Sequence, residues 1–132
     1  MRFIFLLLIF ITPHVTATDM VMIDFDENAI TLSKAKELGF IPELLSDENK
    51  YGHSTFRVVN PKTTKDCKVH FAKAELFTNG HSIASFMMSE YGQGSKQYFS
   101  ANINPAIVDS LYVEVFCMSN RIYKFKANPN AL

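Results

Sequence analysis

Apolar and polar residues alternate with a period of two over most of the chain after His53. The clearest run spans residues 111–117, where every second residue is apolar. Shorter runs of the same kind occupy residues 56–58, 67–76, 84–88, 98–103 and 122–127. This alternation is typical of strands that bury one face, and turn residues separate the runs. The pattern therefore predicts about seven short strands.

Turn signals and one phase slip give the predicted strands their limits. Asn79–Gly80 is a strong hairpin signal, and residues 92–94 carry two further glycines. Asn60–Pro61 and Asn104–Pro105 are expected to break strands. Within residues 67–76 the apolar phase moves from the odd positions to the even ones. One extra residue in a strand swaps its faces, so this slip predicts a β-bulge.

A single convincing helical signal covers residues 31–39. Thr31 or Ser33 can cap its start, and Gly39 is placed to end it in a left-handed conformation. Leu32, Ala35 and Leu38 recur at three-residue spacing and are expected to face the core. Residues 41–45 follow with Pro42 near their start, which suggests a second helical turn.

These elements predict a mainly β fold. We expect one antiparallel β-sandwich, immunoglobulin-like or another small sandwich or barrel, with one short N-terminal helix. The absence of tryptophan leaves the immunoglobulin topology without its usual packing residue. The expected core places one apolar group opposite another: Leu111, Val113 and Val115 opposite Phe56, Val58 and Phe71.

Composition limits the class of protein. The chain has 132 residues, which suits one domain, and its 13 basic side chains equal its 13 acidic ones. Non-specific nucleic-acid binding needs a basic face, so no nucleic-acid partner is expected.

The N-terminus has the pattern of a secretory signal peptide. Arg2 precedes an unbroken apolar run from Phe3 to Ile11, and small or β-branched residues lead to Ala17. The run is shorter than the roughly 20 residues of a membrane-spanning helix. We expect a signal peptide over residues 1–17 and a single exported β-rich domain over residues 18–132. The expected location is secreted or periplasmic, with no stable membrane anchor after cleavage.

The two cysteines are expected to form a disulfide. Cys67 opens one predicted strand and Cys117 closes another. In an oxidising compartment two cysteines of one small domain most often pair. The sequence contains no CxxC motif, which would have indicated a reactive thiol instead of a structural disulfide.

The candidate metal ligands are scattered along the chain. His53, His70 and His81 are isolated in sequence, and none forms a zinc-ligand spacing. Met87 and Met88 are adjacent and point to opposite faces of a strand, so they cannot both bind one copper ion. The acidic cluster over residues 24–28 lacks the glycine of a calcium loop. We expect no metal site and no cofactor.

No catalytic motif is present. Residues 92–96 (Gly-Gln-Gly-Ser-Lys) lack the spacing of a phosphate-binding loop, and predicted strands flank them. No serine lies in a GxSxG nucleophile motif. No catalytic residue is predicted, and the chain is not expected to be an enzyme.

These observations favour a small exported, disulfide-bonded β-domain that acts through its surface as a non-enzymatic binding or accessory module. The expected partner is a protein, a glycan or a component of the cell envelope. The alternative is a small exported metal-binding protein or enzyme, with a site that converges from distant strands. The three histidines and the acidic cluster at Asp24 to Glu27 would then supply its ligands.

Overall fold

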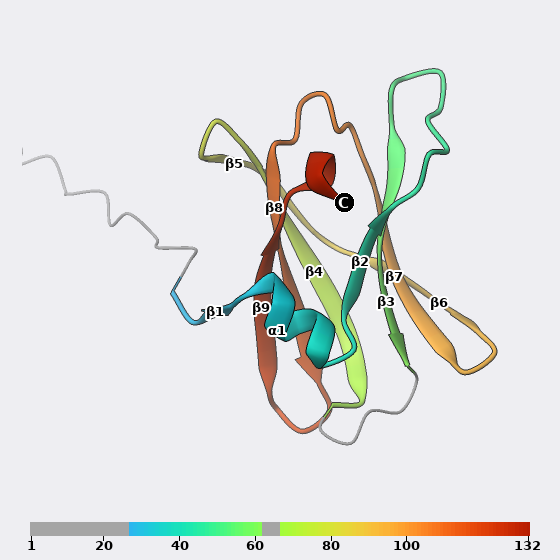
Figure 1. Cartoon of the computed structure of the whole chain (residues 1–132), viewed down its shortest axis with the longest axis vertical. Helices are drawn as coiled ribbons and strands as arrows, with labels where there is room; N and C mark the ends of the chain where they lie inside the picture. The colour runs from blue at the N-terminus through green and yellow to red at the C-terminus, as the bar shows by residue number, and fades with distance from the viewer. Residues whose placement is uncertain (1–26, 62–66) are drawn as a thin grey trace, which may run out of the picture.

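Two sheets, one short α-helix and a single 3-10 turn (Pro129–Ala131) make up the described part of the chain (Figure 1). The computed structural model describes residues 27–61 and 67–132. The predicted signal peptide lies outside these residues. The predicted mainly β class with one short N-terminal helix is confirmed.

The five-stranded sheet has the order β1-β9-β8-β4-β5. Its strands are β1 (Ala29–Ile30), β4 (Val69–Thr78), β5 (His81–Met87), β8 (Ser110–Cys117) and β9 (Ile122–Ala127). All its neighbours are antiparallel except β1 and β9, which pair in parallel. The predicted sandwich is therefore antiparallel apart from this two-residue edge strand.

The four-stranded sheet has the order β2-β3-β7-β6, and all its pairs are antiparallel. Its strands are β2 (Ile41–Leu44), β3 (Ser54–Pro61), β6 (Ser89–Gln93) and β7 (Lys96–Ile103). Figure 1 shows the chain passing from β5 in one sheet directly to β6 in the other. Met88 lies at this crossing and is buried, whereas Met87 is exposed. The two methionines point to opposite faces, as predicted.

The helix α1 (Leu32–Glu37) begins and ends where the sequence predicts. The Thr31 Oγ1 atom accepts a hydrogen bond from the Lys34 backbone N–H over 3.2 Å. Gly39 adopts a φ of +92°, the left-handed conformation of a helix C-terminus. Ala35 is fully buried, and Leu32 and Leu38 pack against the core.

The predicted second helical turn at residues 41–45 is wrong. Ile41–Leu44 forms the edge strand β2, in which Ile41 pairs with Val59 and Leu44 pairs with Phe56. Pairing with β3 overrides the local preference that Pro42 gives for a helix start. Proline lacks a backbone donor, and an edge strand tolerates that loss.

The hairpin and the bulge predicted in β4 are confirmed. Asn79 and Gly80 have φ values of +50° and +76° and join β4 to β5. The register between β4 and β8 shifts between Val69 and Phe71, which is the predicted phase slip. The expected turn at residues 92–94 is displaced toward the C-terminus, because β6 continues to Gln93.

The core lies between the two sheets. Leu111, Val113 and Val115 from one sheet, and Phe56 and Val58 from the other, are all at most 1% exposed. Phe71 is the exception to the predicted core. The bulge turns it to the outer face of the five-stranded sheet, where it stacks on Phe116 with 4.3 Å between ring centroids.

The predicted disulfide is confirmed. Cys67 and Cys117 are bonded with 5.2 Å between their Cα atoms, and the bridge joins the start of β4 to the end of β8. Within residues 27–61 and 67–132, no helix is long and apolar enough to cross a membrane.

Candidate functional site

The structure does not bring the predicted metal candidates together. His53, His70 and His81 are all exposed. The His70 ring packs edge-on against Phe71 with 5.3 Å between centroids. Among the described residues, no three histidine, cysteine or acidic side chains form a group that fits a metal ion. Asp24 and Asp26 of the acidic cluster lie outside those residues.

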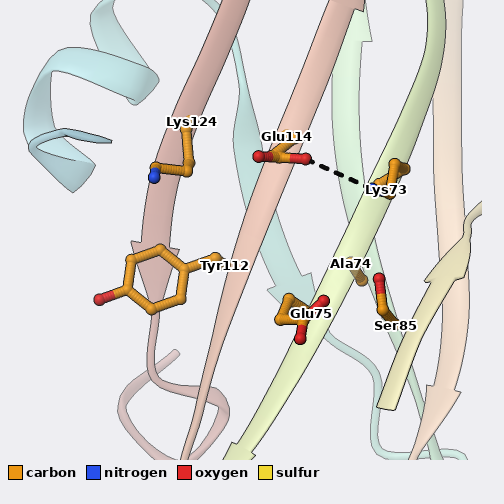
Figure 2. Close-up of a pocket in the computed structure, with 7 residues that line it drawn as sticks. All are labelled: Lys73, Ala74, Glu75, Ser85, Tyr112, Glu114 and Lys124. Carbon is orange, nitrogen blue, oxygen red and sulfur yellow. Dashed lines mark ion pairs between the residues drawn. The ribbon is translucent and has the colours of Figure 1, made fainter. Parts of the chain in front are cut away.

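A polar hollow of about 110 Å³ lies on the outer face of the five-stranded sheet (Figure 2). Lys73 and Glu114 form an ion pair across it with 3.7 Å between Nζ and Oε2. Glu75 accepts a hydrogen bond from the Ser82 hydroxyl, and Lys124 lies 5.9 Å from the centre of the Tyr112 ring. Two lysines and two glutamates line the hollow, so it carries no excess charge and is a weak candidate for an ion site.

The outer face of the four-stranded sheet carries an apolar row that crosses all four strands. The strand register places Ile41 beside Val59, Val59 beside Tyr98, and Tyr98 beside Tyr91. We call these four residues the outer row. Val58 and Phe99 belong to the core cluster, so Val59 and Tyr98 point to the opposite face. Ile41 and Tyr91 end the row on the two edge strands, and each is 42% exposed.

Arg57 holds one side of the outer row in place. Its Nε donates to Glu43 Oε2 over 2.7 Å, and its Cζ lies 4.8 Å from the centre of the Tyr98 ring. Hydrogen bonds to the Tyr91 hydroxyl and to Glu43 raise the pKa of Arg57 above its ordinary value. Tyr91 stacks on Tyr98 with 4.9 Å between centroids and 8° between ring planes. These contacts fix the side chains before any ligand arrives.

A second hollow, of about 210 Å³, opens at the Ile41 end of the outer row. Ile41 and Val59 supply its apolar surface, and Gly39 adds backbone without a side chain. Glu43 lies at one rim and is paired with Arg57. Lys96 lies at the hollow as well and forms no ion pair with any described residue. The hollow therefore combines an apolar surface with one lysine that has no ion-pair partner in the described part of the chain.

Sequence reasoning missed this site. Its lining residues come from β2, β3 and β7 and from the end of α1, and the predicted helical turn at residues 41–45 hid one of these elements. A signal was present in the sequence. Val59 and Tyr98 are apolar residues in the polar phase of their strands, and such positions indicate an outer face that is not simply solvated.

Comparisons with known proteins give little. No family model matches the chain, and no curated protein matches it. A solved structure with a similar arrangement is that of a superoxide reductase (neelaredoxin) from Ignicoccus hospitalis, which is 13% identical with a TM-score of 0.44. The match covers 81% of this chain and 97% of that chain. A likeness at this level transfers no activity or metal site.

The functional interpretation of the sequence needs correction at this point. The chain was expected to be an exported, non-enzymatic binding or accessory module. That interpretation is contradicted, because the disulfide alone does not establish export and no family model or curated protein supports a binding or accessory role. Whether this chain itself catalyses a reaction is a separate question, and its expected lack of activity stays a prediction.

Proposed function

We propose that the chain binds a small organic anion with an apolar body in the hollow at Ile41. The observation that carries this proposal is an apolar hollow lined by Lys96, which forms no ion pair with a residue that the structure describes. Small-molecule sites are typically concave and mostly apolar, with a few polar groups that fix orientation. Here Ile41 and Val59 contact the body of the ligand, and the Lys96 ammonium pairs with its anionic group.

Charge around the hollow favours an anion over a cation. Glu43 is the acidic residue of the lining, and Arg57 neutralises it through contacts of 2.7 Å. An entering anion therefore meets the positive Lys96 and an already paired carboxylate. An alkylammonium ion would meet unpaired positive charge and no free negative charge.

The direct test is a titration with ligands that share a body and differ in charge. Hexanoate, phenylacetate and hexylammonium are suitable probes. The chain contains no tryptophan, so its intrinsic fluorescence comes from its five tyrosines, of which Tyr98 lies beside the lining residue Val59 in the strand register. We expect saturable binding of the two carboxylates and none of hexylammonium.

Two variants locate the site. Lys96→Glu reverses the charge at the rim and should weaken hexanoate binding about tenfold or more, the equivalent of about 1.4 kcal/mol. Lys126→Glu makes the same charge change at an exposed position of β9, in the other sheet, and should leave binding unchanged. Equal loss in both variants, or no carboxylate binding by the wild type, contradicts the proposal.

We propose in addition that the protein works in an oxidising compartment after secretion or transfer to the periplasm. The disulfide and the tripartite N-terminal pattern support this location. Intact mass of the exported product should show a chain that begins at or near Thr18. A mature product that retains residues 1–17 contradicts it.

A further inference from the structure

Four strands form the edges of the two sheets, and three of them carry features that oppose pairing with another chain. The strand β1 has two residues, and β2 contains Pro42. The register between β4 and β5 shifts next to Phe77, which distorts the β5 edge. Short length, proline and irregular register are the usual protections of an edge strand. The fourth edge, β6, has none of them.

The strand β6 is regular and open to solvent. All five of its residues, Ser89 to Gln93, are exposed. They pair with β7 in an uninterrupted register. Such an edge presents unpaired backbone donors and acceptors to another strand.

The turn that joins β6 to β7 shows which backbone groups face outward. Gly94 and Ser95 form a two-residue turn between Gln93 and Lys96, and Gly94 has a φ of +58°. In such a turn the two residues that flank it, here Gln93 and Lys96, exchange backbone hydrogen bonds. Pairs with and without backbone hydrogen bonds then alternate along the hairpin. Tyr91 is thus hydrogen-bonded through its backbone to Tyr98. The backbone N–H and C=O groups of Glu90 and Gly92 point to the free edge.

We propose that two copies of this chain pair through β6 in an antiparallel, two-fold arrangement centred on Tyr91. Tyr91 is the middle residue of the strand, so the two-fold axis places it opposite Tyr91 of the second copy. Glu90 then exchanges backbone hydrogen bonds with Gly92 of the second copy, and Gly92 does the same with Glu90. Each outward-facing group named above gains a partner.

Side chains and charge agree with this pairing. Across the interface Ser89 faces Gln93, and Glu90 faces Gly92, so no two like charges meet. The formal net charge of the chain is zero at pH 7, so two copies do not repel each other at long range. On the outer face Tyr91 stacks on Tyr98, and the second Tyr91 would extend this aromatic stack into the other copy.

Pairing of β6 makes one eight-stranded sheet from two four-stranded sheets. The two outer rows then become continuous through the pair of Tyr91 side chains. The hollows at Ile41 lie at the far ends of this sheet, on the opposite edge from β6. Pairing therefore leaves both hollows open and does not depend on a ligand.

Sedimentation equilibrium of the wild-type chain over a wide concentration range tests the pairing. We expect a reversible monomer–dimer equilibrium. Tyr91→Lys places two like charges opposite each other and should raise the dimer dissociation constant about tenfold or more. Ser85→Lys introduces a lysine on the β5 edge instead and should leave the constant unchanged. A wild type that is monomeric throughout, or equal effects of the two variants, overturns the proposal.

A cysteine pair tests the register. A non-hydrogen-bonded antiparallel pair has its Cα atoms about 4.5 Å apart, within the range of a disulfide. Tyr91→Cys should therefore cross-link two copies under mild oxidation. Ser89→Cys on the same strand would face Gln93 of the second copy and should stay monomeric on a non-reducing gel. Cross-linking by both variants to the same extent, or by neither, overturns the two-fold register at Tyr91.

Discussion

The guanidinium group of Arg57 lies over the ring of Tyr98 with 4.8 Å between Cζ and the ring centroid. The same group is hydrogen-bonded to Glu43 over 2.7 Å, and the Tyr98 ring stacks in turn on Tyr91. A planar guanidinium can lie flat on a ring while its N–H groups donate within its plane, whereas an ammonium is a compact point charge that cannot stack in this way. This contact is therefore specific to arginine and joins β2, β3, β7 and β6.

Arg57→Ala should lower the free energy of unfolding by about 1–2 kcal/mol, because it removes a cation–π contact and a partly buried ion pair. Arg57→Lys should recover less than half of this loss. Urea denaturation measures both values. Lys34→Ala breaks the exposed pair between Lys34 and Glu37 and serves as the control, with an expected change below about 0.5 kcal/mol. A lysine variant as stable as the wild type would contradict the role of stacking.

Val113→Asp should prevent folding. Val113 is fully buried in β8, and an unpaired carboxylate there costs several kcal/mol against a total stability of about 5–15 kcal/mol. Circular dichroism at increasing temperature should show no cooperative transition. His70→Ala and His81→Ala alter exposed side chains and should melt close to the wild type. A Val113→Asp variant that melts like the wild type would mean that β8 is assigned to the wrong face.

Loss of the disulfide should destabilise the chain by about 2–4 kcal/mol, since the bridge limits the unfolded state. The double variant Cys67→Ala, Cys117→Ala and the reduced wild type should show similar losses in urea denaturation. The oxidised wild type has no free cysteine among its two, so a thiol reagent should not label it before reduction. Labelling of unreduced protein would be evidence against the bridge.

Acid should weaken the contact between Asp47 and Thr55. The Thr55 backbone N–H and then its hydroxyl donate to the Asp47 carboxylate, and both lower the pKa of Asp47 below its ordinary value of 3.8. A carboxyl group with a lowered pKa stabilises the folded state when the pH lies above the ordinary pKa of that group. This stability is lost as the pH falls through the pKa that the group has in the folded state. Asp47→Asn should therefore melt below the wild type at neutral pH.

The difference between Asp47→Asn and the wild type should shrink once the pH falls below 3.8. Melting curves at a series of pH values measure it. Glu48→Gln removes a carboxylate from the same loop and is the matched control. If the difference in melting temperature stays constant down to the most acidic condition, Asp47 does not contribute to the loss of stability in acid.

Asn60→Leu should raise the stability of the chain by about 1 kcal/mol or more. Asn60 is fully buried, and neither its Oδ1 nor its Nδ2 has a hydrogen-bond partner among the described residues. A buried polar group without a partner carries a desolvation cost that an apolar group of similar size avoids. The neighbouring Gln97 donates to Glu90, so Gln97→Leu should instead lower stability. Thermal melts should therefore show a higher melting temperature for Asn60→Leu than for the wild type, and a lower one for Gln97→Leu.

Local patterns predicted the features that local chemistry decides. The alternation over residues 111–117, the left-handed residues at Asn79–Gly80 and the capped helix after Thr31 each need only a few neighbouring residues. The bulge in β4 was visible because the apolar phase changes within one strand. The same bulge turned Phe71 outward, which the alternation before the slip did not indicate.

Features that depend on register were not predictable in the same way. Residues 41–44 have no strong strand signal, and only their pairing with β3 makes them a strand. Ile41 and Val59 are far in the sequence from each other and from the hairpin of Tyr91 and Tyr98, and the outer row exists because three register alignments coincide. Lys96 has no ion-pair partner among the described residues, and only the folded structure shows that its charge lies beside the hollow at Ile41.

The disulfide gives the molecule the connectivity of a ring over much of its length. Five strands, β4 to β8, lie between Cys67 and Cys117 in the chain. A protease that cuts once within this stretch, for example at the exposed turn between Gly94 and Ser95, opens the ring without releasing a fragment. The two pieces stay covalently joined, and the paired strands hold them in register. Only a reducing agent separates them, since a second cut within the stretch releases just the segment between the two cuts. The intact mass of the oxidised protein therefore changes after one cut only by the added water.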